Sequence, residues 1–317
     1  MLRSFVVLTS VCAAYAAVLP RDAPNGVHLA VDPKCGVAGG RFGDVNIGLK
    51  PLTSYEHIVA FGDSWTDGGA HNGEPLPPPV LTPPNPRAGG RASNGPVWVE
   101  KLASAAGATL LDFAEIGAVT DKNIWPSSLL PTTASSANDF VGQAHNYINQ
   151  RNGFDPETTL YTIFLGVGDF DLSQQTGTDN LYTVAGAIVY TILELTSYPT
   201  YAKNIIVVDN YGRGIYETPS GDAFKEGIYA GLNTLHTRYG TSVGFVDLKT
   251  LWDGVLGSSP GYEAFGYTSK AACLPSSTST SGACANPEST FYWLPGIPSA
   301  ATHGLIADYV EKVLTTC

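Results

Sequence analysis

Five short apolar runs, separated by longer stretches with helical periodicity, constrain the fold of this 317-residue chain more than any other feature. Each run is rich in β-branched or aliphatic side chains, as expected of a buried strand. The runs span residues 57–61, 109–113, 159–165, 204–209 and 243–247. Strands that alternate with helices form parallel βαβ units with right-handed crossovers. The sequence therefore predicts a three-layer α/β/α sandwich around a five-stranded parallel sheet.

Two of the expected helices show their apolar faces clearly. Between residues 181 and 195, apolar side chains recur every three or four positions, and Thr178 or Asp179 is the expected N-cap. Residues 224–235 repeat this pattern behind Asp222. Stripes of this kind are the core-facing sides of amphipathic helices. We therefore expect both helices to lie against the sheet.

The N-terminal part of the chain differs from the rest. Residues 1–17 combine Arg3, an apolar run and a small-residue cleavage pattern, which predicts a secretory signal peptide. Residues 18–54 are rich in Gly, Pro and Asp without clear periodicity, and are expected to form an arm over the domain. Residues 55–317 are expected to form that single domain. We therefore expect a secreted, extracellular protein without a membrane-spanning helix.

Charge and motif content narrow the range of ligands. The formal net charge is −11 at pH 7, so nucleic acid and anionic membrane surfaces would be repelled. The chain has no phosphate-binding glycine loop, no dinucleotide fingerprint and no residue spacing typical of a metal site. We therefore expect no cofactor and no metal, a monomer, and a neutral or cationic ligand.

Four cysteines follow the predicted signal, an even number that suits an oxidising compartment: Cys35, Cys273, Cys284 and Cys317. Three pairings are possible. We favour Cys273 with Cys284, which would close a Ser/Thr-rich loop, and Cys35 with Cys317, which would tie the arm to the last residue. A catalytic or metal-binding cysteine is less favoured, because the neighbouring histidines that it would need are absent.

The segment FGDSWTD, residues 61–67, follows the first apolar run directly. Gly62 permits a sharp turn, so Ser64 stands just past the end of a strand. In open α/β sheets, ligands bind outside the carboxyl ends of the strands. The sequence therefore predicts a reactive serine at this edge. The alternative is that Asp63 and Ser64 only cap the following segment.

Together with a second segment, GRASNGPVWVE at residues 90–100, this motif resembles the GDSL or SGNH esterases. The resemblance is strongest to the fungal secreted acetylesterases of carbohydrate esterase family sixteen, and it spans roughly residues 55–314. It implies an SGNH hydrolase fold, which is flavodoxin-like, and Ser64 as the nucleophile that attacks a small ester or an acetylated saccharide. It also implies that the amides of Ser64 and Gly117 donate to the oxyanion.

Three other positions depart from the family pattern. The family's oxyanion-hole asparagine is here Gly168, and losing one such donor costs roughly a hundred- to a thousandfold in rate. Residues 292–299 align with the family segment W-D-x-x-H-P-T, where Leu294 replaces the carboxylate and Ile297 replaces the histidine base. Aliphatic side chains neither accept nor orient a proton. The sequence thus predicts a weak or inactive relative that keeps a saccharide- or acyl-binding cleft.

The alternative is an active carboxylic ester hydrolase that uses Ser64 with a rearranged base. His303 is one candidate base, on a helix expected to begin near Ser299. His71, in the loop after Ser64, is the other. The candidate carboxylates are Asp67, Asp169 and Asp171.

Overall fold

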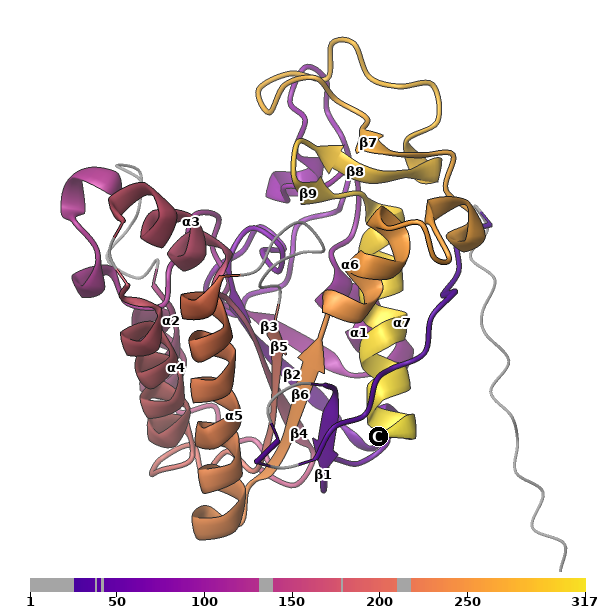
Figure 1. Ribbon diagram of the computed structural model, residues 1–317. Helices are drawn as coiled ribbons and strands as arrows, with labels where there is room; N and C mark the ends of the chain where they lie inside the picture. Colours follow the sequence, from indigo (N-terminus) through magenta and orange to yellow (C-terminus); the bar gives the residue numbers. More distant parts are fainter. Residues whose placement is uncertain (1–25, 38, 41–42, 131–138, 178, 210–217) are drawn as a thin grey trace, which may run out of the picture.

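A six-stranded sheet forms the centre of the computed structural model, which describes residues 26–37, 39–40, 43–130, 139–177, 179–209 and 218–317. The strand order is β1–β6–β5–β4–β2–β3 (Figure 1). The strands are β1 Val45–Ile47, β2 His57–Gly62, β3 Thr109–Asp112, β4 Thr159–Phe164, β5 Asn204–Asp209 and β6 Ser242–Asp247. Strands β2 to β6 run parallel, as predicted. The predicted signal peptide, residues 1–17, lies outside the described residues.

The sixth strand, β1, corrects the predicted five-stranded sheet. It lies in the segment expected to be an irregular arm, and it pairs antiparallel with β6 through Val45 and Phe245. Three residues are too few to show a strand periodicity, which is why the sequence pattern did not indicate it. The pairing extends the sheet at the edge furthest from β3.

Helices cover both faces of the sheet, which confirms the three layers (Figure 1). Helices α2, α4 and α5 pack on one face, and α1, α6 and α7 on the other. The helices are α1 Trp98–Ala106, α2 Phe140–Gln150, α3 Val167–Thr176, α4 Leu181–Leu195, α5 Pro219–Tyr239, α6 Lys249–Leu256 and α7 Ala300–Thr316. Short 3₁₀ turns occur at Leu52–Ser54, Ala88–Gly90, Lys122–Ile124, Ser127–Leu129, Tyr262–Phe265 and Pro287–Ser289.

Two helix starts differ from those expected. Asn180 is the N-cap of α4, in place of Asp179, and Thr178 lies outside the described residues. Helix α5 begins one turn before the predicted cap Asp222, because the Thr218 hydroxyl accepts the Gly221 amide at 3.1 Å and a proline occupies the first turn. The N-cap of α7 is Ser299, as expected.

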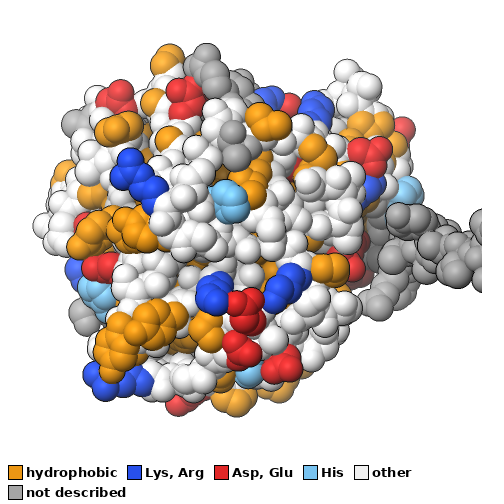
Figure 2. All heavy atoms as spheres, turned by 90° about the horizontal axis from the view of Figure 1, so that it is seen from below, with side chains coloured by type: hydrophobic (Ala, Val, Ile, Leu, Met, Phe, Trp, Pro, Cys, Tyr) orange, Lys and Arg blue, Asp and Glu red, His pale blue; other side chains and the backbone are white. Residues whose placement is uncertain are grey.

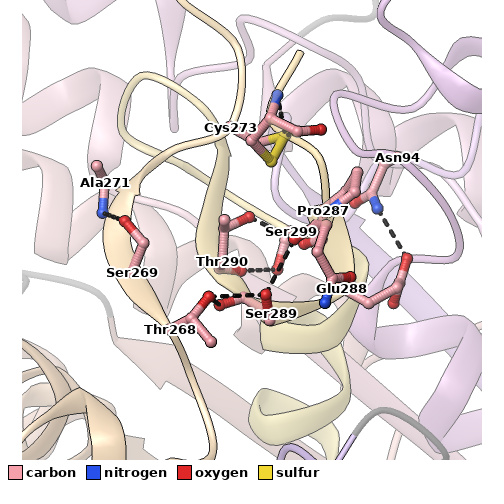
Figure 3. The surroundings of a disulfide bond; sticks show 12 residues. Asn94, Thr268, Ser269, Ala271, Cys273, Pro287, Glu288, Ser289, Thr290 and Ser299 are labelled. Carbon is pink, nitrogen blue, oxygen red and sulfur yellow. Dashed lines mark hydrogen bonds between the residues drawn. A yellow bond between two sulfur atoms is a disulfide. The ribbon is translucent and has the colours of Figure 1, made fainter.

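A second, three-stranded sheet at one end of the molecule was not predicted (Figure 1). It consists of β7 Ser269–Ala272, β8 Thr290–Leu294 and β9 Ile297–Pro298. The Ser299 hydroxyl donates to the Thr290 carbonyl oxygen at 2.6 Å and so ties β8 to the start of α7 (Figure 3). Strands this short, with an irregular register, carry little alternation in the sequence.

Both favoured disulfides are present, Cys35–Cys317 and Cys273–Cys284. The second holds the loop between β7 and β8 beside the small sheet (Figure 3). The described part of the arm is also fastened to α7, because Asn46 donates to the Leu314 carbonyl oxygen at 2.9 Å. Within the described ranges, the chain has no helix with the length and apolar character needed to span a membrane.

Candidate active site

Ser64 lies in a tight turn directly after β2 and is half-buried. Asp63 organises this turn: its carboxylate accepts the Trp65 amide at 2.9 Å, and its carbonyl oxygen accepts the Thr66 and Asp67 amides at 3.0 and 2.9 Å. The turn thus presents the serine at the carboxyl edge of the sheet. The Ser64 hydroxyl has no hydrogen-bond partner in the described part of the chain.

The loop after β3 carries Gly117 and is fastened to the serine turn. The Glu115 amide donates to the Gly62 carbonyl oxygen at 3.1 Å, and the Ile116 amide donates to the Asp67 carboxylate at 2.8 Å. Gly117 has a φ of +84°, which favours glycine. Among the described residues, neither the Gly117 amide nor the Ser64 amide has an acceptor. Free amides on two joined segments are the donors that an oxyanion hole requires.

Gly168 lies in the first turn of α3, just after β4. A Cβ atom placed there would stand 3.3 Å from the Ala118 carbonyl oxygen and 3.4 Å from the Val119 side chain. The start of α3 therefore abuts the loop that carries Gly117, as the resemblance implies. The glycine offers no side-chain donor to that loop.

Leu294 and Ile297 face each other as register partners on β8 and β9. Leu294 is buried in a cluster that also contains Ala92, Cys273, Leu274 and Trp293, which we call the aliphatic cluster. Ile297 and Ile116 both pack against it and are half-buried. Apolar side chains thus fill both positions at which the resemblance expects a carboxylate and an imidazole.

Comparison with known proteins finds a family model that is similar to the first part of the domain. Residues 58–208 match the family model described as GDSL-like Lipase/Acylhydrolase. These residues, a little under half of the chain, are similar to the GDSL/SGNH esterases. The match includes the segments of Ser64, Gly117 and Gly168, and it ends before the β8–β9 hairpin.

Two known proteins with similarity to this chain are esterases. An acetylesterase from Hypocrea jecorina is 30% identical over 131 residues, a match that covers 38% of this chain and 37% of the relative. This chain therefore aligns with little more than a third of that enzyme. A variant of an acetyl xylan esterase from Geobacillus stearothermophilus is 15% identical with a TM-score of 0.44, covering 82% of this chain and 94% of that chain.

All six histidines of the chain lie in its described part, and none forms a hydrogen bond with Ser64. Four are engaged elsewhere: His28 with the Gly26 carbonyl oxygen, His57 in a stack on Phe154, His145 with Glu194 and His236 with the Thr241 carbonyl oxygen. A general base must lie within hydrogen-bond reach of the proton that it removes, directly or through one water. These four side chains are bound at other places.

His303, the first candidate base, is fully buried on α7, and neither ring nitrogen has a hydrogen-bond partner among the described residues. Burial, with a smaller effect from the nearby Lys101 charge, lowers the pKa of His303 to about 3. The imidazole is therefore neutral, and it forms no hydrogen bond with the Ser64 hydroxyl. The role of His303 as a base stays a prediction.

His71, the second candidate, is oriented by two acceptors. Its Nδ1 atom lies 3.1 Å from the Ala114 carbonyl oxygen and 3.5 Å from the Asp67 carboxylate. Because a carbonyl oxygen only accepts, Nδ1 carries the hydrogen in the neutral form of His71, and Nε2 then keeps its lone pair. Burial raises the pKa of Asp67, and the His71 charge and two backbone amides oppose that rise. His71 and Asp67 are the residue types that form a general base and its orienting carboxylate, but His71 is not hydrogen-bonded to Ser64.

The other two candidate carboxylates, Asp169 and Asp171, are not paired with a candidate base as Asp67 is with His71. Asp169 is fully buried, accepts the Thr120 amide and hydroxyl and the Trp125 indole hydrogen, and so fixes the loop after Gly117. Burial raises its pKa to about 6 despite these bonds. Asp171 is exposed. Neither carboxylate is bonded to a histidine in the described part of the chain.

Two buried polar groups near this edge were missed by the sequence reasoning. Gln143, on α2, hydrogen-bonds the backbone of Gly62, and its only sequence signal is a polar residue within an apolar helical stripe. Lys225, on α5, pairs with Asp247 at 2.9 Å and Asp209 at 3.3 Å. Burial lowers the pKa of Lys225, but these two charges outweigh burial and raise it. No pattern indicated this trio, because its members come from three separate elements.

Proposed function

We propose that this protein is a secreted, degenerate ester hydrolase of the GDSL/SGNH type that binds a small ester or acylated saccharide at Ser64 and turns it over slowly or not at all. One observation carries the proposal: no imidazole is hydrogen-bonded to the Ser64 hydroxyl, and all six histidines lie in the described part of the chain. Without a base, a serine hydroxyl is a poor nucleophile. Leu294 and Ile297 supply no substitute.

We propose that ligand binding is retained although catalysis is weak or lost, and two observations support this. The amides of Ser64 and Gly117 are free to donate to a carbonyl oxygen. Ile116 and Ile297 are half-buried aliphatic side chains that suit an acyl group. Binding and oxyanion donors alone give about a thousandfold acceleration over water in serine hydrolases that lack their triad. Residual turnover at or below that level is expected.

The similarity of part of the chain to an acetylesterase supports a small acyl ester as the ligand. The net charge of −11 supports a ligand that is not anionic. Two disulfides support an oxidising, extracellular location. We further propose that the protein acts as a monomer without cofactor or metal.

Labelling with a fluorophosphonate probe tests this proposal, because the probe reacts only with an activated serine. The wild-type protein and Ser64→Ala should both stay unlabelled under conditions that label an active GDSL esterase completely. Rapid labelling that disappears in Ser64→Ala would overturn the proposal.

The second candidate function is an active carboxylic ester hydrolase, and one observation favours it. His71 is a histidine with a carboxylate partner, Asp67, in the loop that follows Ser64. If this pair serves as the base, labelling of Ser64 should be rapid in the wild type and should be lost in His71→Asn. The proposed degenerate protein would show no difference between these two forms.

A further inference from the structure

The loop between β7 and β8 contains an unbroken run of serine and threonine. Residues 276–281 read SSTSTS, and we call them the hydroxyl loop. Prolines stand on both sides of the run, at Pro275 and Pro287. Segments rich in Ser, Thr and Pro are typical of chains that carry O-linked sugars. Figure 1 shows that the loop between β7 and β8 projects from the end of the molecule formed by the small sheet, away from the central sheet.

Three residues of the hydroxyl loop are exposed: Ser277, Thr278 and Ser281. The Ser277 and Ser281 hydroxyls have no hydrogen-bond partner in the described part of the chain. The Thr278 hydroxyl lies 2.9 Å from the Ser276 hydroxyl, in an exposed bond that a solvent molecule can replace. An enzyme can therefore reach all three oxygens without unfolding the protein.

The backbone of the hydroxyl loop is held at its ends and open between them. The Cys273–Cys284 disulfide closes the loop, and the Thr280 amide donates to the Pro84 carbonyl oxygen at 2.9 Å. Among the described residues, no backbone group of residues 276–279 is bonded to another backbone group. Proteins that bind extended peptides hydrogen-bond such free main-chain groups. The loop thus offers its hydroxyls on a segment that a modifying enzyme can bind.

Serine and threonine hydroxyls can receive either a sugar or a phosphoryl group. Kinases select their substrates largely by charge patterns, and the sequence has no charged residue between Lys270 and Glu288. Figure 2 views the end opposite the small sheet, and charged side chains of both signs lie there. Two disulfides support passage through an oxidising compartment, where secretory sugar transferases act. A sugar is therefore favoured over a phosphoryl group.

We propose that the hydroxyl loop is O-glycosylated, with Ser277, Thr278 and Ser281 as the acceptors. In this reaction the side-chain oxygen forms a bond to the anomeric carbon of a sugar phosphate donor, and the bond from that carbon to the phosphate oxygen breaks. The phosphate leaves with the bonding electron pair, and the hydroxyl proton passes to a base of the transferase. The proposal rests on the proposed secretion of the protein and is independent of the reactivity of Ser64.

Mass spectrometry of the disulfide-bonded protein tests this proposal, with the full chain expressed in a fungal host and recovered from the medium. The intact mass should exceed that of the processed polypeptide by whole sugar residues, and peptide fragmentation should place these sugars within residues 276–281. The triple variant Ser277→Ala/Thr278→Ala/Ser281→Ala should lose at least half of the excess mass. Its melting temperature should equal that of the sugar-free wild type, because the replaced side chains are exposed.

The matched control is Ser127→Ala/Ser128→Ala. These two serines are also exposed and also follow a proline, Pro126, but they lie in a 3₁₀ turn outside any Ser/Thr run. This variant should keep the whole excess mass.

The possible results separate the sugar from the secretion. Secreted wild type with the mass of the bare polypeptide would overturn the glycosylation and leave the proposed secretion intact. Protein retained in the cells without sugar would overturn both. An excess mass that the triple variant keeps in full, or that a phosphatase removes, would overturn the glycosylation of the hydroxyl loop.

Discussion

The side chain of Gln143 hydrogen-bonds both backbone groups of Gly62: Oε1 accepts the Gly62 amide, and Nε2 donates to the Gly62 carbonyl oxygen, each at 2.9 Å. Gln143 is 1% exposed, so no solvent competes for these bonds. Gly62 itself cannot be larger, because a Cβ there would stand 2.8 Å from the Phe164 carbonyl oxygen. Helix α2 thus fixes the end of β2 from which the serine turn begins.

Gln143→Leu should lower the free energy of unfolding by about 1–3 kcal/mol, because it leaves the buried Gly62 amide without an acceptor. The Gly62 carbonyl oxygen keeps its bond from the Glu115 amide. Urea unfolding at constant pH measures the change. Asn149→Leu is the control, since Asn149 is exposed on the same helix and its substitution should change stability by less than about 0.5 kcal/mol. Equal stability of the two variants would contradict the role given to Gln143.

Introducing the family's residues at Gly168, Leu294 and Ile297 together tests whether these positions correspond to the family's catalytic positions. Leu294 and Ile297 are register partners, so the carboxylate of Leu294→Asp would stand opposite the imidazole of Ile297→His. Gly168→Asn needs the neighbouring Ala118 carbonyl and Val119 side chain to move by only a few tenths of an ångström. The triple variant should raise the Ser64-dependent hydrolysis of an aryl acetate by roughly 10²–10⁴-fold.

The single variant Leu294→Asp is the control for the repaired site. It buries a carboxylate without a partner, so it should lower stability and leave the rate unchanged. Circular dichroism should show that the triple variant is folded. A folded triple variant with no gain in rate would show that the β8–β9 hairpin does not correspond to the family's segment.

Stability should depend on pH through Asp44. Burial raises the pKa of Asp44 to about 6, although Tyr309, the Asp247 amide and the Lys34 amide all donate to it. Because this pKa exceeds the ordinary value of 3.8, the stabilising contribution is complete below about pH 4 and is lost as the pH rises through 6. Relative to Asp44→Asn, the unfolding free energy of wild type should fall by up to about 3 kcal/mol from pH 4 to pH 7.

The comparison with Asp44→Asn isolates this effect from an opposing one. The pKa of His303 is lowered to about 3, so its contribution is lost as the pH falls below its ordinary value of 6.5, and this loss occurs in both proteins. Urea unfolding curves at a series of pH values give the difference. Parallel pH profiles for wild type and Asp44→Asn would contradict the pKa assigned to Asp44.

The sequence predicted the layers of the fold because strands β2 to β6 are continuous apolar runs and α4 and α5 have clear stripes. It missed β1 and the β7–β9 sheet, whose strands have two to five residues and depend on long-range pairing. A three-residue strand such as Val45–Ile47 is defined by its partner β6, and local pattern does not reveal such a partner.

The positions of Ser64 after β2 and Gly117 after β3 were predictable, because one residue marks each segment, and their catalytic roles stay predictions. Interactions between distant elements were not predictable. His71 became a candidate from its position after Ser64, but its bond to the Ala114 carbonyl oxygen follows from the packing of two loops. Likewise, no sequence pattern places Ile116 and Ile297 against one aliphatic cluster, because they are 181 positions apart in the chain.

Hydrolysis of p-nitrophenyl acetate by wild type and by Ser64→Ala tests most directly whether Ser64 lacks esterase activity. We predict that the wild-type kcat is far below the range of about 1–10³ s⁻¹ usual for enzymes, and that the Ser64→Ala rate is within about tenfold of it. A wild-type kcat inside that range that is abolished by Ser64→Ala would contradict the account and identify an active esterase.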